Sequence, residues 1–189
     1  MRETYVVTAP TEEPLSLDQV KNHLRVDVGE DDVWLMGAIR AARERAEAVT
    51  GRALVTRTVE VTRDGWPAGP VWVLPHPPLQ SVTSIKYTDV AGVEATFDAA
   101  NYLVDARSTP GRIVLKTAAG WPSAVLREVN GVVVRYVAGY GLRGAVPREI
   151  VAGMLLAVGE MYENRENAPG AGVGVAERMW LKHRVFFSW

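Results

Sequence analysis

The sequence predicts an α+β protein, in which a helical core carries an inserted antiparallel β subdomain and a C-terminal aromatic tail. Apolar residues recur at helical spacing near both ends of the 189-residue chain, within residues 17–49 and 150–162. The region between them, residues 54–140, is rich in β-branched side chains and is punctuated by Pro and Gly. The chain then ends in a basic and aromatic stretch, Arg178–Trp189.

The first helix is marked at its start. Ser16 and Gln19 have the spacing of a capping box, in which the serine caps the helix and the glutamine reaches back to its amide. Leu17, Val20 and Leu24 then recur at helical spacing. Residues 26–29 break the pattern before a second helix begins.

The second helix is longer and amphipathic. It begins with Glu30, Asp31 and Asp32, whose charges suit the positive end of a helix dipole. Gly51 stands where a left-handed C-terminal cap belongs. The apolar stripe consists of Leu35, Ile39, Ala42, Ala46 and Val49, and the expected outward face carries Arg40, Arg43, Glu44, Arg45 and Glu47.

Six or seven short strands are expected after Gly51. Alternation over residues 55–62 and the apolar runs 71–74, 79–87 and 131–137 predict strands. Two hairpins are indicated as well. One turns at Asp89–Gly92 and leads into residues 93–97, and the other joins residues 102–104 to 112–115 through Pro110–Gly111. Short connections between so many strands are typical of an antiparallel sheet or a small sandwich.

A third, broad apolar helix is expected from Pro147 to about Asn164. The glycine-rich segment 169–174 then predicts a hinge at Gly170, Gly172 and Gly174, and residues 178–189 predict a short terminal helix. The expected division is residues 1–53 for the N-terminal helices, 54–141 for the β subdomain, 142–168 for the core helix and 169–189 for the hinge and tail.

Composition excludes several classes of protein. The net charge is −1, whereas general nucleic-acid binders carry a basic excess. The chain has no cysteine, so disulfides and thiolate metal sites are excluded. No apolar run is long enough for a membrane span, and residues 1–5 lack the apolar core of a signal peptide. We therefore expect a soluble protein of the cytoplasm in which it is made.

Catalytic constellations are missing from the sequence. His23, His76 and His183 lie far apart and have no partner at metal-ligand spacing. Asp31 and Asp32 are better explained by their place at a helix start. The glycines of residues 170–174 follow a helix rather than a strand, so they do not fit a dinucleotide-binding loop. We expect no enzyme activity, no cofactor and no metal.

The aromatic C-terminus instead indicates a binding partner. Chain ends are usually frayed and polar, yet this one holds two Trp and two Phe that must be buried somewhere. Trp and Arg dominate interface hot spots, and a flexible linker before them allows docking into a neighbouring groove. The alternative is that the tail packs on its own body.

Five segments, taken in order, resemble the head–tail connector (adaptor) proteins of tailed bacteriophages and their prophage and gene transfer agent relatives. These segments are Leu15–Val26, Ala48–Leu54, Leu74–Val82, Tyr136–Gly141 and Met161–Glu166. No single segment is a chemical motif, but their order and spacing are specific. The resemblance covers the chain from about Leu15 to Trp189.

The resemblance implies a structural role in the virion, at the neck where head and tail join. Such proteins form a ring, typically a dodecamer, beneath the portal protein; the ring extends the channel for double-stranded DNA and receives the stopper or tail-terminator protein. They are made and assembled in the bacterial host cytoplasm and need no membrane. By similarity, the portal-docking residues would be Met179, Trp180, Leu181, Arg184, Phe186, Phe187 and Trp189.

A ring also needs contacts between neighbouring copies. A closed ring with head-to-tail contacts requires two different complementary surfaces on each subunit. The candidates for this interface are Arg40, Arg43, Glu44 and Glu47 on the charged face of the second helix. The alternative interpretation of this face is a solvated surface with ion pairs along the helix.

Two other functions remain open at this stage. A carbohydrate- or ligand-binding β module with helical flanks would use Trp66, Trp72 and Trp121 as a stacking platform. Core or loop packing is the competing explanation for these three side chains. A hydrolase is disfavoured because no catalytic constellation is present.

Overall fold

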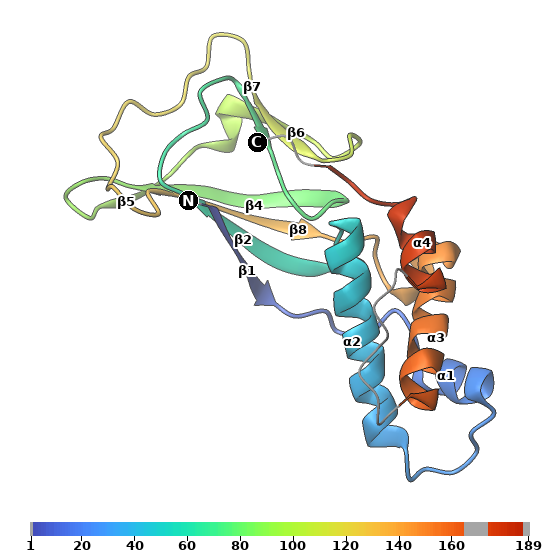
Figure 1. The fold of residues 1–189 in the computed structure, drawn as a ribbon. Coiled ribbons are helices and arrows are strands. Elements are labelled where there is room, and N and C mark those ends of the chain that lie inside the picture. Colours follow the sequence, from blue (N-terminus) through green and yellow to red (C-terminus); the bar gives the residue numbers. More distant parts are fainter. Residues whose placement is uncertain (1, 165–173, 187–189) are drawn as a thin grey trace. The chain divides into compact units, whose positions relative to one another are not determined.

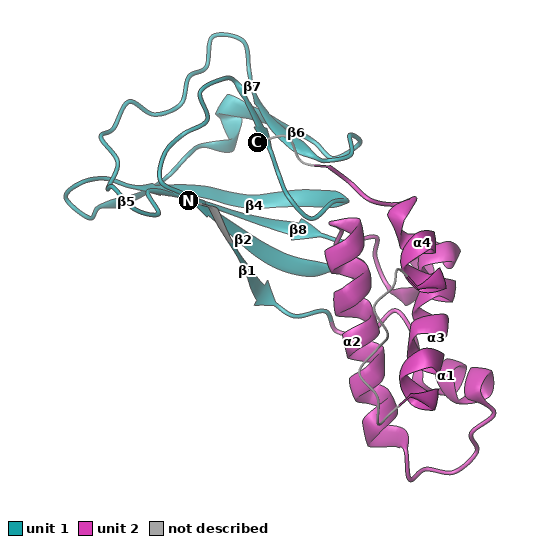
Figure 2. Cartoon of the chain, viewed as in Figure 1, with its two compact units in different colours: residues 1–10, 56–139, 189 teal, residues 11–55, 140–188 magenta. Residues whose placement is uncertain are grey.

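The computed structural model describes residues 2–164 and 174–186, which divide into two compact units (Figure 2). Unit 1 contains residues 2–10 and 56–139 and is built of β-strands. Unit 2 contains residues 11–55 and 140–186, apart from the undescribed 165–173, and is helical. The expected α+β class is confirmed.

Unit 1 contains two antiparallel sheets (Figure 1). The larger has the strand order β1-β2-β8-β4-β5 and the smaller the order β3-β7-β6. The strands are β1 Arg2–Thr8, β2 Arg57–Arg63, β3 Val71–Val73, β4 Leu79–Thr88, β5 Glu94–Thr96, β6 Tyr102–Asp105, β7 Arg112–Leu115 and β8 Val132–Ala138.

Both predicted hairpins are present. Strand β4 pairs with β5, with Lys86 opposite Thr96, and Gly92 takes a φ of 81° in the turn. The Asp89 Oδ1 atom accepts hydrogen bonds from the amides of Ala91 and Val93 and so closes this turn. Strand β6 pairs with β7, with Asp105 opposite Arg112.

The N-terminal residues differ from the expected division. Residues 1–53 were assigned to the helical part, but residues 2–10 belong to unit 1 and contribute β1 at the edge of its larger sheet. Val6 lies opposite Val59 of β2, a residue more than fifty positions later. A pairing over such a distance leaves no mark in the local sequence pattern.

The three tryptophans of the ligand-platform hypothesis form part of the packing of unit 1. Trp72 is buried, and the rings of Trp66 and Trp121 stack with centroids 5.0 Å apart and an interplanar angle of 10°. Phe97 contacts both Trp66 and Trp121. In the stack each ring covers one face of the other, and Phe97 packs against both, so these contacts favour the packing explanation.

Unit 2 begins with the two expected helices, α1 (Leu17–Leu24) and α2 (Asp32–Thr50). The capping box is confirmed: the Gln19 amide donates to Ser16 Oγ at 3.1 Å, and the Ser16 amide donates to Gln19 Oε1 at 2.9 Å. Gly51 caps the C-terminal end of α2 with a φ of 69°, the left-handed conformation that its position predicted.

The remaining helices are α3 (Arg148–Glu163) and α4 (Val175–Leu181). Helix α3 follows Pro147, close to where the sequence placed its start. The terminal helix predicted over residues 178–189 is wrong in its extent. Helix α4 begins three residues earlier and ends at Leu181, and residues 184–186 are not helical.

Candidate assembly surfaces

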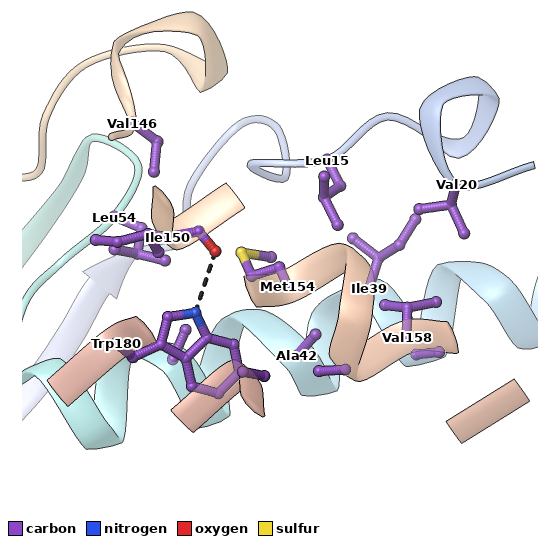
Figure 3. Packing of buried hydrophobic residues seen from close by; sticks show 14 of the residues in the cluster. Leu15, Val20, Ile39, Ala42, Leu54, Val146, Ile150, Met154, Val158 and Trp180 are labelled. Carbon is purple, nitrogen blue, oxygen red and sulfur yellow. Dashed lines mark hydrogen bonds between the residues drawn. The ribbon is translucent and has the colours of Figure 1, made fainter. Parts of the chain in front are cut away.

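Helix α4 is attached to unit 2 through Trp180, which is fully buried (Figure 3). Its indole lies in one core cluster with Ile150 and Met154 of α3, Ala42 of α2 and Leu54. The Nε1 group donates a hydrogen bond of 3.1 Å to the Ile150 carbonyl. Trp180 was expected to be a docking residue, but here it packs on its own body, the alternative that the sequence left open.

The segment after α4 is held along the same unit. The Val185 amide donates to the Thr50 carbonyl at 2.9 Å, and Arg52 Nε donates to the His183 carbonyl at 2.6 Å. Lys182 Nζ lies 2.6 Å from Glu149 Oε1. These contacts reach α3 and the C-terminal end of α2, so they fix the path of the chain as far as Val185.

Glu149 is the electrostatic partner of this segment. Hydrogen bonds from Lys182 and then His183, whose Nε2 lies 3.1 Å from Glu149 Oε2, hold the pKa of the Glu149 carboxyl below its usual range. The lowered pKa keeps the carboxylate charged beside the two basic side chains.

This path leaves several of the expected docking side chains exposed. Phe186 is 77% exposed, and Leu181 and Arg184 are exposed as well. The Arg184 guanidinium lies 5.0 Å from the centre of the Phe186 ring, within the range of a cation–π contact. Met179 is half-buried. The other two docking candidates, Phe187 and Trp189, lie outside the described residues.

Only one glycine of the expected hinge falls within the described residues. Gly174 is the N-terminal cap of α4, in an extended conformation. Gly170 and Gly172 lie outside the described residues, so the structure does not bear on their part of the hinge.

Two of the four interface candidates expected on the outer face of α2 are bonded within unit 2, and the other two are exposed. Arg43 is only 6% exposed and bonds to Glu13 at 2.7 Å and to Glu47 at 3.0 Å. Glu47 also accepts a hydrogen bond from the Leu54 amide. Arg43 and Glu47 were expected on the outward face, and this is wrong, because both take part in bonds within unit 2. Arg40 and Glu44 are exposed as expected.

A groove that the sequence did not predict lies beside the exposed Arg40. It has a volume of about 620 Å³. Its lining includes Leu17 of α1 and a row on α2 formed by Val33, Met36, Gly37 and Arg40. Val33 is 78% exposed and Met36 is 52% exposed. The signal was present in the sequence, because Val33, Met36 and Gly37 recur at helical spacing opposite the buried stripe.

A metal centre is absent from the part of the chain that the structure describes. No group of three or more His, Asp or Glu side chains there is placed to hold a metal ion. Asp31 and Asp32 are bonded separately: Tyr162 donates to Asp31 at 2.7 Å, and Lys21 pairs with Asp32 at 2.7 Å. No described helix has the length and apolar character needed to cross a membrane.

Comparison with known proteins finds one family match and several similar solved structures. Residues 14–99 match the model of the phage gp6-like head–tail connector protein family. The chain is similar to head–tail connectors. The resemblance found in the sequence is thus confirmed. No curated protein matches the chain significantly.

Solved structures share the whole fold. A chain from the neck of an empty gene transfer agent particle, computed with C6 symmetry, is 24% identical with a TM-score of 0.83, over 99% of this chain and 97% of that one. A chain from a native gene transfer agent virion is 24% identical, with a TM-score of 0.81 and coverages of 98% and 97%. A chain from a native neck computed with C12 symmetry is 25% identical, with a TM-score of 0.81 and coverages of 99% and 97%.

Proposed function

We propose that this chain is a non-enzymatic structural subunit of a head–tail connector, located at the neck of a phage or gene transfer agent particle. The observation that carries this proposal is the TM-score of 0.83 with a neck chain over 99% of this chain. The family match of residues 14–99 supports it from the sequence side.

The proposed assembly is a ring of twelve copies. One similar neck was computed with C12 symmetry, which supports this number for the present chain. A closed ring of identical subunits uses two different surfaces of each copy, and the groove beside α2 supplies one candidate. In the particle the ring would lie beneath the portal protein and receive the stopper or tail-terminator protein on its other side.

DNA would pass through the proposed ring without being held. Each phosphate that a protein neutralises adds to its affinity for DNA, so a strongly basic lumen would resist sliding. The net charge of −1 is compatible with a channel through which double-stranded DNA moves without sequence-specific binding.

The proposed contact with the portal protein is the exposed end of the tail. Leu181, Arg184 and Phe186 present apolar and cationic surface after the buried Trp180 has attached the segment to unit 2. Phe187 and Trp189 extend this aromatic character in the sequence. Trp180 thus serves as the internal anchor of the docking segment.

The test is a truncation that leaves the anchor in place. A chain ending at Val185 keeps Trp180 and the Val185–Thr50 hydrogen bond but loses the exposed aromatic end. We expect this variant to fold and to form rings, and to lose binding to the portal protein of the same particle in electron microscopy and pull-down measurements. Unchanged portal binding would exclude the docking role, and failure of the full chain to form rings with or without its portal would exclude the connector function.

A further inference from the structure

The exposed face of α2 has the character of a helix-packing surface. Val33 and Met36 present apolar surface, and nothing lies within 4 Å of the position that a Cβ atom would take on Gly37. A glycine on such a face lets another backbone approach closely. Arg40, one turn further on, is exposed and forms no ion pair within the described part of the chain.

A second surface lies on α3 and α4 of the same unit. Leu156 is 41% exposed and Val175 is 57% exposed, and both line a hollow of about 520 Å³. Glu160 and Glu163 are exposed beside them, and neither pairs with a cation among the described residues. Arg178 also lines the hollow, so this surface carries charges of both signs, and His23 lies at its edge with α1.

These two surfaces face different directions within unit 2. Helices α2 and α3 pack side by side through Ile39 and Ala42 on one and Met154 and Val158 on the other (Figures 1 and 3). Residues exposed on each helix therefore point away from the shared core. One copy of the chain cannot bring its own two surfaces together, but two neighbouring copies can.

We infer that the α2 groove of one copy receives the α3–α4 surface of the next copy, and that this is the contact that closes the ring. This inference rests on the connector function proposed above. Apolar side chains stand on both sides of the contact, Val33 and Met36 against Leu156 and Val175, and their burial provides the driving force. Arg40 meets Glu160 and Glu163, which sets the register and orientation of the two copies.

Crosslinking tests the pairing directly, because the natural chain has no cysteine. Full-length Met36→Cys and Leu156→Cys variants are mixed under conditions where the wild type assembles and are treated with a short bismaleimide. We expect crosslinked dimers in the mixture, little product from either variant alone, and a ladder of oligomers from the double variant. Val125→Cys, exposed on unit 1, replaces Leu156→Cys in the matched control mixture and is expected to give background product only.

Charge reversal gives an independent readout. We expect Arg40→Glu to lower the assembled fraction at least about tenfold, because like charges then face each other. Adding Glu160→Lys and Glu163→Lys to that variant should restore assembly, whereas Arg107→Glu on unit 1 should have no effect. Native mass measurement and electron microscopy report ring formation.

The outcomes separate the two proposals. Wild-type rings combined with background crosslinking and no effect of Arg40→Glu would overturn this interface and leave the connector function standing. Absence of wild-type rings, alone and with the portal protein, would overturn both. A crosslinked ladder together with rescue by the reversed charges supports both.

Discussion

Gly153 of α3 and Trp180 of α4 are in direct packing contact, and a Cβ atom added to Gly153 would lie 2.5 Å from the indole Nε1. The same indole group donates to the Ile150 carbonyl one turn earlier. The glycine therefore makes room for the ring on α3 and keeps the hydrogen bond within reach. This local fit explains how a short helix of seven residues is held in place after residues 165–173.

Gly153→Ala is expected to destabilise unit 2. In an unconstrained helix interior the same substitution stabilises the folded state by about 0.5–1 kcal/mol, because alanine loses less backbone entropy than glycine on folding. Here the added methyl group overpacks the core, and we expect a net loss of about 1–3 kcal/mol in the free energy of unfolding, measured by urea denaturation.

Gly159→Ala, on the same helix, is the matched control. Its added Cβ would meet Leu24 and His23 at 3.8 and 3.9 Å, which are ordinary contacts. We expect this variant to be as stable as the wild type or more stable. Equal stability of both alanine variants would contradict the proposed fit between Gly153 and Trp180.

Arg43 is predicted to stabilise the fold and not to form the ring contact. Arg43→Met leaves Glu13 and Glu47 without their shared cation in a mostly buried site, and we expect a loss of about 2–3 kcal/mol. Arg40→Met, on the exposed face, should change the free energy of unfolding by less than about 0.5 kcal/mol. Thermal and urea unfolding of the two variants would distinguish the roles, and a stable Arg43→Met would disprove this assignment.

Local signals in the sequence predicted the parts of the fold that depend on near neighbours. The bonds between Ser16 and Gln19 span three residues, and the left-handed cap at Gly51 depends on a single backbone conformation. The hairpin turn at Asp89 likewise closes within a few residues. Each of these features could be recognised because all its parts stand together in the chain.

Features that join distant residues were not predicted in the same way. Strand β1 pairs with β2 across more than fifty residues, and Trp180 bonds to Ile150 across thirty. Arg43 follows Ile39 by one helical turn, so its place beside the buried stripe was visible, but its partner Glu13 stands thirty residues away. The charge of Arg43 therefore indicated an outward position, because spacing alone could not show that the Glu13 carboxylate would pair with it.

We expect the stability of unit 1 to depend on pH through the carboxyl group of Asp105. Hydrogen bonds from the Ser108 side chain and backbone and from Arg112 lower the pKa of its carboxyl from 3.8 to about 2. A carboxyl with a lowered pKa in the folded state adds stability at pH values above its unfolded pKa. That contribution should be complete above about pH 3.8 and should be lost as the pH falls toward 2.

Asp105→Asn tests this assignment, because it removes the titrating group and keeps its size. We expect the variant to be less stable than the wild type at neutral pH and the difference to shrink as the pH falls from about 3.8 to 2. Urea unfolding of unit 1 at several pH values measures the difference. A difference that stays constant over this range would show that the charge of Asp105 has no part in the stability of the β6–β7 hairpin.

We expect Trp180 and Phe186 to have separate roles within one short segment, Trp180 in stability and Phe186 in portal binding. Trp180→Ala removes a fully buried indole and should cost about 3–5 kcal/mol of unfolding free energy. Phe186→Ala removes a mostly exposed ring and should change stability by less than about 0.5 kcal/mol, while it weakens portal binding at least tenfold.

The comparison requires both stability and binding to be measured on the same variants. Trp180→Phe provides the intermediate case, because it keeps a buried aromatic ring but loses part of the buried area and the hydrogen bond to Ile150. We expect it to bind the portal protein like the wild type at temperatures where it is folded, since the exposed ring of Phe186 is unchanged. If Trp180→Phe lost portal binding while it stayed folded, the indole itself would be a contact, and its buried position would be only one of two states of the tail.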